Sequence, residues 1–523
     1  MGKNIRKPFV IHPYLFAIIP VIFLYAHNID RTTLTSALLP MIVLLCTAVI
    51  FTQLLWFILR DIIKSGLIVS IILFIFFSHG HLHLLLLDWL SKNFIYKASW
   101  DKINLLSKMD IVLHLPLFMV WFMISRRLIN IILKRKVDFF LATKFLNTFS
   151  VFMISFSIIN IGLYSYKKDI HQKTNIEYHK SSSIVGLETK PDIYYIILDG
   201  YGREDILRDL YNFDNGDFLN YLAKKGFYVA SKSCSNYAWT FLSLPSSLNF
   251  EFINYLTNDV GIESNDLRIP FEMIKNNQVA QFLRGKGYLF VHFKSTWGAT
   301  LSNKYADIEI GYEDGLFRDE FLRILVQTTA LKFLTSMITE DLAQSHLYTF
   351  KMLESVPDIQ DPTFTFVHLV LPHHPFIFDS NGNVKHHVTL LDQFQANMWE
   401  KKDDYIEQLI FVNKKMKVVI DTILKKSITP PIIILQSDHG PQVFGVSNDT
   451  FIKARMAILN AYYLPRSNYL LYDSITPVNT FRLVFSHYFG EKISLLDDKS
   501  YVSTFEKPYN FKVVSCSDKF EYK

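Results

Sequence analysis

The stretch DIYYIILDGYGR, residues 192–203, decides the fold of the larger part of this chain. A short run of β-branched and aromatic residues ends abruptly in Asp199 and a glycine-containing turn, as a buried strand does. Similar runs recur as GFYVASKS, YLFVHF, TFTFVHLVL, PIIILQ and ARMAILNAYYL, and amphipathic helical stretches separate them. This alternation predicts an α/β domain over residues 191–523 with a mostly parallel sheet flanked by helices.

Polar side chains follow three of these predicted strands. Asp199 ends the first, Asp438 and His439 follow PIIILQ, and His373 and His374 follow TFTFVHLVL. In open α/β sheets the ligand site lies beyond the carboxyl ends of the strands. Two carboxylates with imidazoles suit one divalent cation, so Mn²⁺, Mg²⁺ or Zn²⁺ would fit, with Mn²⁺ favoured. His368, inside the third strand, is interpreted as structural.

A candidate nucleophile lies in SCSNYAWTFLSLPSSLNF, residues 233–250. Thr240 stands where a polar loop enters an apolar, helical segment, and a hydroxyl at a helix amino terminus is well placed to act beside a cation. Ser243 is the rival hydroxyl. Pro245 limits the prediction, because a proline beyond the first turn kinks a helix or moves its start downstream.

The first 165 residues predict a transmembrane domain, a bundle of about five helices. Apolar blocks approach the roughly 20 residues that a membrane helix needs, and they cover residues 12–28, 36–59, 66–88, 110–126 and 145–165. Basic residues favour a cytoplasmic position for the amino terminus and for the loop between the fourth and fifth blocks. That loop and the adjacent end of the fourth block contain Arg126, Arg127, Lys134 and Arg135. Lysines between the third and fourth blocks weaken this assignment. Residues 166–190 predict a linker, and the domain after it then lies outside.

Composition excludes several classes of protein. The chain has 523 residues, of which 50% are hydrophobic and 20% charged, so it is neither disordered nor fibrous. A net charge of +6 indicates no nucleic-acid partner. Cys234 and Cys516 are the only cysteines that could pair outside the apolar blocks, and the sequence leaves their pairing open. The SHGHLH segment, with His79, His81 and His83, is interpreted as a bundle contact or the polar end of a span, rather than a metal site.

The motifs ILDGYGR, SNYAWTFLSLPSSLN, LPHHPFIFD and SDHG occur here in the order found in the alkaline phosphatase superfamily. The chain resembles its membrane-anchored, sulfatase-like branch, which contains lipoteichoic acid synthases and other phosphoglycerol and phosphoethanolamine transferases. The resemblance implies that Asp199, Asp438 and His439 bind the metal, and that Thr240 is both a metal ligand and the nucleophile.

The resemblance also implies substrate-binding residues. His373 matches a histidine that contacts the substrate, and it is preferred to His374. Lys294, Trp297 and Lys304 stand, at altered spacing, where lipoteichoic acid synthases grip phosphoglycerol, so that specificity is in doubt. Cys234 lacks the x-Pro-x-Arg continuation of formylglycine sulfatases, which argues against sulfate-ester hydrolysis by that route.

The function expected from the sequence is therefore enzymatic. The expected enzyme transfers a phosphoglycerol- or phosphoethanolamine-type group from a membrane phospholipid to a cell-surface glycan. It would be a multi-pass protein of a bacterial inner or cytoplasmic membrane, with its catalytic domain on the periplasmic or extracellular side. The alternatives are a metal-dependent phosphodiesterase or sulfatase-like hydrolase with the same site, and a catalytically inactive family member that binds glycan or lipid. The oligomeric state stays open.

Overall fold

The computed structural model describes residues 9–29, 32, 34–90, 103–135, 138–171, 190–314, 319–385, 399, 401–443, 446–465, 467 and 470–516. Its contacts divide the chain into two compact units. One is Met1–Asn175 with Asp319–Ile338, and the other is Ile176–Arg318 with Thr339–Lys523. The short segment Asp319–Ile338, which falls inside the predicted outer domain, thus joins the unit of the N-terminal helices. Of the predicted linker, residues 172–189 lie outside the described residues.

The first unit is built from apolar helices. They are α1 (His12–His27), α2 (Leu34–Leu59), α3 (Ile62–Leu90), α4 (Ile103–Lys134) and α5 (Phe140–His171), joined by α12 (Glu320–Gln327) and η4 (Ala330–Leu334). Within the described residues, four of these helices, α2 to α5, are long and apolar enough to cross a membrane, whereas α1 has 16 residues and is shorter. The unit therefore has four or five candidate spans, against the five expected.

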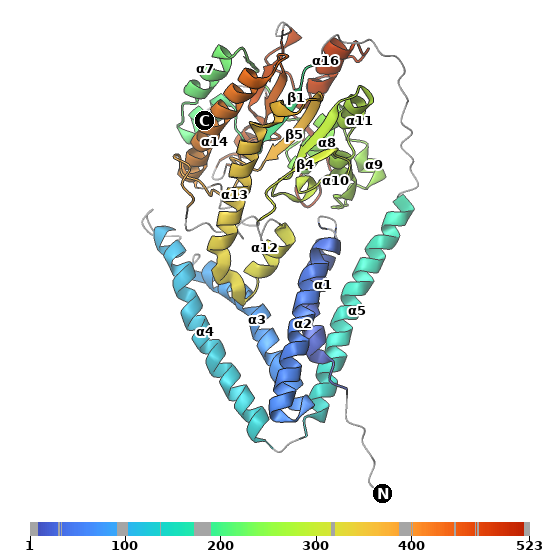
Figure 1. Cartoon of the computed structure of the whole chain (residues 1–523), viewed down its shortest axis with the longest axis vertical. Helices are drawn as coiled ribbons and strands as arrows, with labels where there is room; N and C mark the ends of the chain where they lie inside the picture. Colours follow the sequence, from blue (N-terminus) through green and yellow to red (C-terminus); the bar gives the residue numbers. More distant parts are fainter. Residues whose placement is uncertain are drawn as a thin grey trace. The chain divides into compact units, whose positions relative to one another are not determined.

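Packing in this unit leaves apolar side chains on its surface. Helix α1 contacts α2, α3 and α5, and α3 contacts α4 (Figure 1). The Asn147 side chain on α5 accepts hydrogen bonds from the backbone N–H groups of Ile11 and His12, which start α1. Outward-facing residues such as Phe57 (65% exposed) and Ile58 (70% exposed) are too apolar for contact with water and suit a hydrocarbon surround.

The histidines of SHGHLH form a bundle contact. His79 Nε2 lies 2.9 Å from His114 Nδ1 on α4, and the rings of His83 and His114 stack with centroids 4.0 Å apart. Lys332 of η4 places its Nζ 2.9 Å from His83 Nδ1. The bundle-contact interpretation of His79 and His83 therefore agrees with the structure.

The second unit contains a seven-stranded sheet in the order β2-β7-β6-β1-β5-β3-β4. Its strands are β1 (Ile193–Leu198), β2 (Tyr228–Val229), β3 (Leu289–Phe293), β4 (Ile308–Ile310), β5 (Thr363–Leu369), β6 (Ile432–Gln436) and β7 (Asn460–Tyr463). Strands β6, β1, β5, β3 and β4 run parallel, and β7 and β2 continue the sheet in antiparallel pairs. A small pair, β8 (Ser500–Val502) and β9 (Lys512–Val514), is antiparallel. The sheet is mostly parallel, as the sequence predicts.

Helices flank this sheet on both faces (Figure 1). The helices of this unit are α6 (Glu204–Tyr211), α7 (Gly216–Lys224), α8 (Thr240–Leu248), α9 (Leu256–Asp259), α10 (Arg268–Lys275), α11 (Gln278–Gly285), α14 (Lys402–Lys426), α15 (Asn448–Met456), α16 (Pro477–Phe489) and the part of α13 (Thr335–Leu353) that follows Ile338. Short 3-10 turns lie at η3 (Gly298–Thr300) and η5 (Val356–Asp358). Alternate residues of β1, β5 and β6 pack with α8, α11 and α16 in one apolar core. Strands buried on both faces need no polar alternation, which explains the continuous apolar runs.

Candidate active site

Three neighbouring strands deliver the polar side chains to one place. Asp199 directly follows β1, Asp438 and His439 follow β6, and His368 lies near the end of β5. Because β6, β1 and β5 are adjacent and parallel, their carboxyl ends meet at one edge of the sheet. The strand-end residues Asp199, Asp438 and His439 therefore lie in one cluster, as the sequence predicts.

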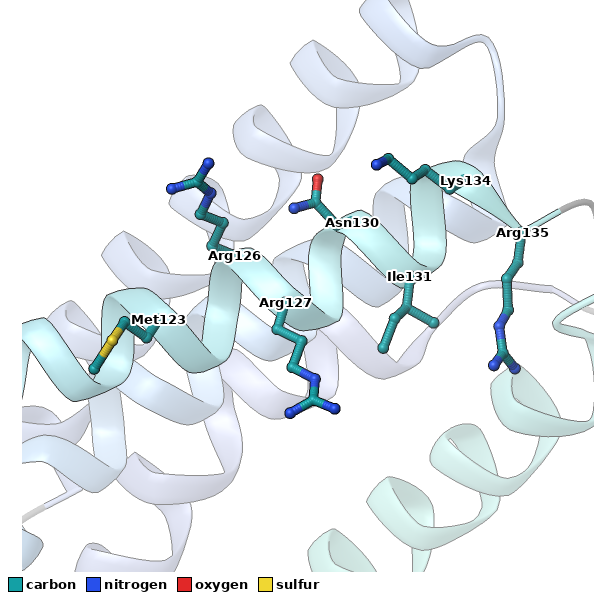
Figure 2. A pocket seen from close by; sticks show the side chains of 7 residues that line it. All are labelled: Met123, Arg126, Arg127, Asn130, Ile131, Lys134 and Arg135. Atoms are coloured by element: carbon teal, nitrogen blue, oxygen red, sulfur yellow. The ribbon is translucent and has the colours of Figure 1, made fainter.

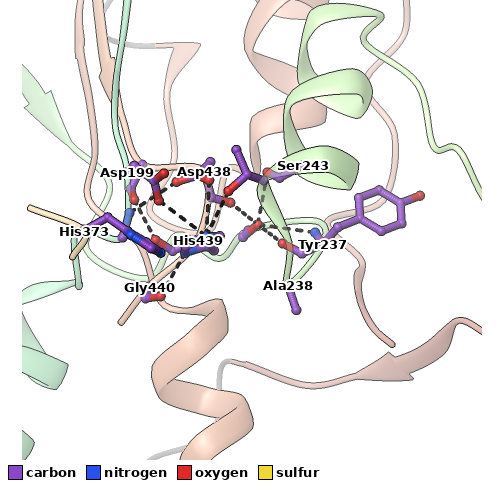
Figure 3. A network of polar contacts seen from close by, with 12 residues as sticks. Asp199, Tyr237, Ala238, Ser243, His373, Asp438, His439 and Gly440 are labelled. Carbon is purple, nitrogen blue, oxygen red and sulfur yellow. Dashed lines mark hydrogen bonds and ion pairs between the residues drawn. The ribbon is translucent and has the colours of Figure 1, made fainter. Parts of the chain in front are cut away.

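The cluster is tight and buried (Figure 3). His439 Nε2 lies 3.4 Å from Asp199 Oδ1 and 3.3 Å from Asp438 Oδ2. His368 Nε2 lies 3.3 Å from the other Asp199 oxygen, Oδ2. Thr240 Oγ1 completes the group, 3.1 Å from His439 Nε2. The structure therefore brings together all four residues that the resemblance names as metal ligands.

The donor set fits a divalent cation. Asp199 Oδ1, Asp438 Oδ2 and His368 Nε2 are buried atoms without a hydrogen-bond partner in the described part of the chain. Ligand atoms of Asp199, His368 and Asp438 lie within 4.8 Å of one another, as do those of Asp199, His373 and His439. Buried carboxylate oxygens without donors are costly unless a cation satisfies them. These residues could hold a metal ion with oxygen and nitrogen ligands.

Two glycines form the tight turns that follow Asp199 and His439. Gly200 adopts φ +73°, a left-handed conformation that favours glycine, and its N–H donates to Asp438 Oδ1 at 3.3 Å. A Cβ on Gly440, the residue after His439, would lie 2.0 Å from the carbonyl oxygen of Ala454. Both turns therefore depend on the absence of a side chain.

Thr240 is the first residue of α8, which puts its hydroxyl at the helix amino terminus. Pro245 lies inside the same helix. The helix therefore begins before the proline, and the predicted shift of its start to a position downstream does not occur. Ser243, the rival hydroxyl, turns instead to Ser235, with the two oxygens 3.3 Å apart. The geometry favours Thr240 over Ser243 as the hydroxyl of the site.

Backbone carbonyls fix the tautomers of two histidines. His439 Nδ1 lies 3.0 Å from the carbonyl oxygen of Gly440, and His373 Nδ1 lies 2.7 Å from that of His374. A carbonyl only accepts, so each Nδ1 carries the proton and each Nε2 presents a lone pair. The Thr240 hydroxyl consequently donates to His439 Nε2. Burial lowers the pKa of both imidazoles, which keeps them neutral and suited to bind a cation.

The site shifts the pKa values of the two carboxyl groups in opposite directions. Burial, followed by the adjacent Asp199 carboxylate, raises the pKa of Asp438 above its usual range. Burial also acts to raise the pKa of Asp199, but the His373, His368 and His439 imidazoles hold it below that range. Adjacent buried carboxylates repel each other, which favours the charged form of one over that of the other. A bound cation would remove this repulsion.

The remaining substrate-binding candidates separate into two groups. The His374 ring lies 4.2 Å from that of His373, and the Trp297 ring meets His368 edge-on at 5.5 Å, so both border the cluster. Lys294 is engaged elsewhere, with its Nζ 2.7 Å from Glu313 Oε1. Lys304 is 69% exposed and pairs with Glu272. The structure does not bring these two lysines to the cluster.

Two residues at the site escape the sequence reasoning. His368 is buried as predicted, but its Nε2 faces Asp199, which corrects the purely structural interpretation. Arg455, on α15, donates from Nε to the carbonyl oxygen of Ala238 at 2.7 Å and from Nη1 to that of Gly440 at 3.1 Å. The only signal for His368 was its position just before a strand end, and Arg455 belongs to no motif.

The segment that leads to Thr240 is also tied to the carboxyl-terminal end of the chain. Cys234 and Cys516 form a disulfide, which answers the question that the sequence left open. Arg203 Nη1 contacts both sulfurs, at 3.6 Å and 3.8 Å. Stable disulfides are typical of oxidising compartments outside the cytosol.

Comparison with known proteins finds similarity among solved structures. No family model and no curated protein matches the sequence. The lipooligosaccharide phosphoethanolamine transferase EptA from Neisseria meningitidis is 13% identical, covers 90% of this chain and 93% of its own, and has a TM-score of 0.39. The periplasmic domain of EcEptC from Escherichia coli, in complex with Zn, is 11% identical over 63% of this chain and 94% of its own, with a TM-score of 0.41. The putative sulfatase yidJ from Bacteroides fragilis is 12% identical over 64% and 84%, with a TM-score of 0.38.

Proposed function

We propose that this chain is a membrane-anchored, metal-dependent transferase of the alkaline phosphatase superfamily. It moves a phosphoethanolamine- or phosphoglycerol-type group from a phospholipid to a cell-surface glycan. The observation that carries the proposal is the Thr240 hydroxyl, 3.1 Å from His439 Nε2 at the amino terminus of α8 and beside two carboxylates with unpaired oxygens. The N–H groups and dipole of a helix amino terminus stabilise the negative charge of a phosphate next to such a hydroxyl.

The chemistry divides into two balanced steps. Asp199, Asp438, His439 and Thr240 would hold one divalent cation, with Mn²⁺ favoured, which would lower the pKa of the hydroxyl and offset phosphate charge. Thr240 Oγ1 attacks the donor phosphorus, the bond from phosphorus to the diacylglycerol oxygen breaks, and that oxygen takes up the hydroxyl proton. The acceptor hydroxyl then attacks the phosphothreonine, the bond to Oγ1 breaks, and the acceptor proton returns to Thr240. In this mechanism His373, whose Nε2 is unprotonated, would relay protons.

The membrane helices favour a lipid donor over a soluble one. An anchored catalytic unit meets a lipid substrate at high effective concentration. The disulfide between Cys234 and Cys516 favours a periplasmic or extracellular position for the catalytic unit. Glycans of the cell surface are then the acceptors within its reach.

The test compares Thr240→Ala with Ser243→Ala, a hydroxyl of the same helix that faces Ser235. The full-length protein is placed in vesicles of phosphatidylethanolamine or phosphatidylglycerol with Mn²⁺, Mg²⁺ or Zn²⁺, and diacylglycerol release is measured with and without surface glycan. We expect Thr240→Ala to lower release by about 10³-fold or more, as loss of a nucleophile does, and Ser243→Ala to retain it. Full activity of Thr240→Ala would contradict the mechanism, and glycan-independent release with no phosphorylated glycan would show hydrolysis instead of transfer.

A further inference from the structure

A basic groove lies at the carboxyl-terminal end of α4. No acidic residue occurs between residues 111 and 137, whereas Arg126, Arg127, Lys134 and Arg135 fall within this stretch. The groove has a volume of about 590 Å³ and is lined by Met123, Arg126, Arg127, Asn130, Ile131, Lys134 and Arg135. We call these seven residues the α4 groove.

The side chains of the α4 groove form two rows with helical spacing, which point to different sides of the helix in Figure 2. Arg126, Asn130 and Lys134 make one row, and the other contains Arg127, Ile131 and Arg135. Residues four apart lie on one face of a helix, so each row is continuous, and residues of both rows line the groove. The rows also place apolar atoms beside the charges, since Met123 is 61% exposed.

The cations of the α4 groove have no counter-ion in the described part of the chain. All four basic side chains are exposed, and none of them makes an ion pair or hydrogen bond among the described residues. Lys64 of α3 adds another positive charge nearby, because its Nζ lies 3.4 Å from the Leu133 carbonyl oxygen. The charge of the groove is therefore available to an outside anion.

The position of the groove along the membrane follows from chain order. Helix α5, with a span at Phe140–Leu163, separates the end of α4 from the residues of the catalytic unit. A single crossing puts the two on opposite sides, whatever the total number of spans. The disulfide assigns the catalytic unit to the oxidising side, so the groove faces the cytoplasm.

We propose that the α4 groove binds the phosphate of an anionic phospholipid headgroup in the cytoplasmic leaflet. Arginine forks match phosphate oxygens in pairs, and Met123 and Ile131 offer an apolar surface to the lipid chains. Basic pockets beside membrane helices on the cytoplasmic side suit such headgroups. Basic loops also set orientation, but that effect counts Lys and Arg alike. A binding site, in contrast, depends on guanidinium geometry and on position.

The experiment uses the full-length protein in detergent, with lipids added and bound molecules counted by native mass spectrometry. The lipids are phosphatidylglycerol and phosphatidylcholine with the same acyl chains. The variant Arg126→Gln/Arg127→Gln removes two charges from the groove. The matched control, Arg60→Gln/Lys144→Gln, removes two exposed charges close to the α2–α3 and α4–α5 connections. A third variant, Arg126→Lys/Arg127→Lys, retains the charge and the expected orientation.

We expect the glutamine variant to weaken phosphatidylglycerol binding by about 25-fold, which is about fivefold for each cation. The control should change it by less than about twofold, and the lysine variant by about fivefold, because the charge remains without the fork. Phosphatidylcholine binding should stay the same in all variants. Equal losses in the glutamine variant and the control would overturn the site in favour of general surface charge. Displacement of the lipid by soluble glycerol phosphate would overturn the lipid assignment. Neither readout depends on transfer activity.

Discussion

Arg455 offers the sharpest test of how Thr240, the proposed nucleophile, is positioned. Its guanidinium joins the carbonyl oxygens of Ala238 and Gly440, at 2.7 and 3.1 Å, and lies 5.0 Å from the centre of the Trp239 ring. Ala238 and Trp239 directly precede Thr240, and Gly440 directly follows His439. One buried side chain thus links the segment before the Thr240 hydroxyl to the loop that carries His439. Arg455→Met keeps an unbranched stem and removes both bonds.

The size of the effect follows from these two contacts. A hydrogen bond to a charged group contributes about 1.5–3 kcal/mol, so loss of both costs about 3–6 kcal/mol before water replaces the donors. A nucleophile misplaced by about 1 Å loses roughly 10²-fold in rate. We therefore expect Arg455→Met to slow phosphorylation of Thr240 by about 100-fold. Arg455→Lys, which keeps the charge and one donor, should slow it by about tenfold.

The assay is a single-turnover quench with an activated aryl phosphodiester, followed by detection of phosphothreonine. Arg482→Met is the matched control, because Arg482 also donates to two carbonyl oxygens, those of Phe250 and Ser494, each at 2.7 Å. Both variants should have a lower melting temperature than the unmodified chain. At a temperature where both are folded, only Arg455→Met should show slower phosphorylation of Thr240. A rate within twofold of the unmodified chain, or an equal loss in Arg482→Met, would refute the positioning role.

Two further predictions concern the surroundings of Thr240. His368→Asn should weaken binding of Mn²⁺ or Zn²⁺ about tenfold in titration calorimetry, as loss of a group beside a metal ligand does; an unchanged dissociation constant would restore the structural interpretation. Replacing Cys234 and Cys516 by serine should lower the free energy of unfolding by about 2–5 kcal/mol, whereas Cys46→Ser, outside the disulfide, should not. Equal denaturation midpoints for these cysteine variants would exclude a stabilising disulfide.

The strand-end residues could be predicted because their position depends on a local rule. Asp199 and Asp438 each follow a short apolar run, and parallel strands bring such positions to one edge. Thr240 was indicated by its position where a polar loop enters an apolar helix, and the motif order added the reason to prefer it to Ser243. The sequence pattern could not place β6, β1 and β5 side by side, because that order is set by long-range pairing.

Residues that act through backbone atoms or across the fold were missed for a physical reason. Arg455 binds carbonyl groups, which every residue carries, so no partner residue type marks it. The sequence of segment Asp319–Ile338 is typical of an amphipathic helix. In the structure, its residues Phe321 and Leu325 pack against Val21 and Ala37 in the first unit. An apolar helix face predicts burial but does not name its neighbour.

The buried carboxyl groups beside Thr240 lower the stability of the folded chain, and this cost indicates that they bind a ligand. A buried polar atom without a partner costs about 1–3 kcal/mol, and more when it is charged. Asp199 Oδ1 and Asp438 Oδ2 are two such atoms, held close together by glycine turns that admit no side chain. Apolar residues at these positions would avoid the cost of burying charge. A ligand that binds only the folded chain stabilises it by about 2.7 kcal/mol at 100 times its Kd. A cation between the carboxylates would offset the cost and leave Thr240 beside a positive charge, which is the setting that phosphoryl transfer to a hydroxyl requires.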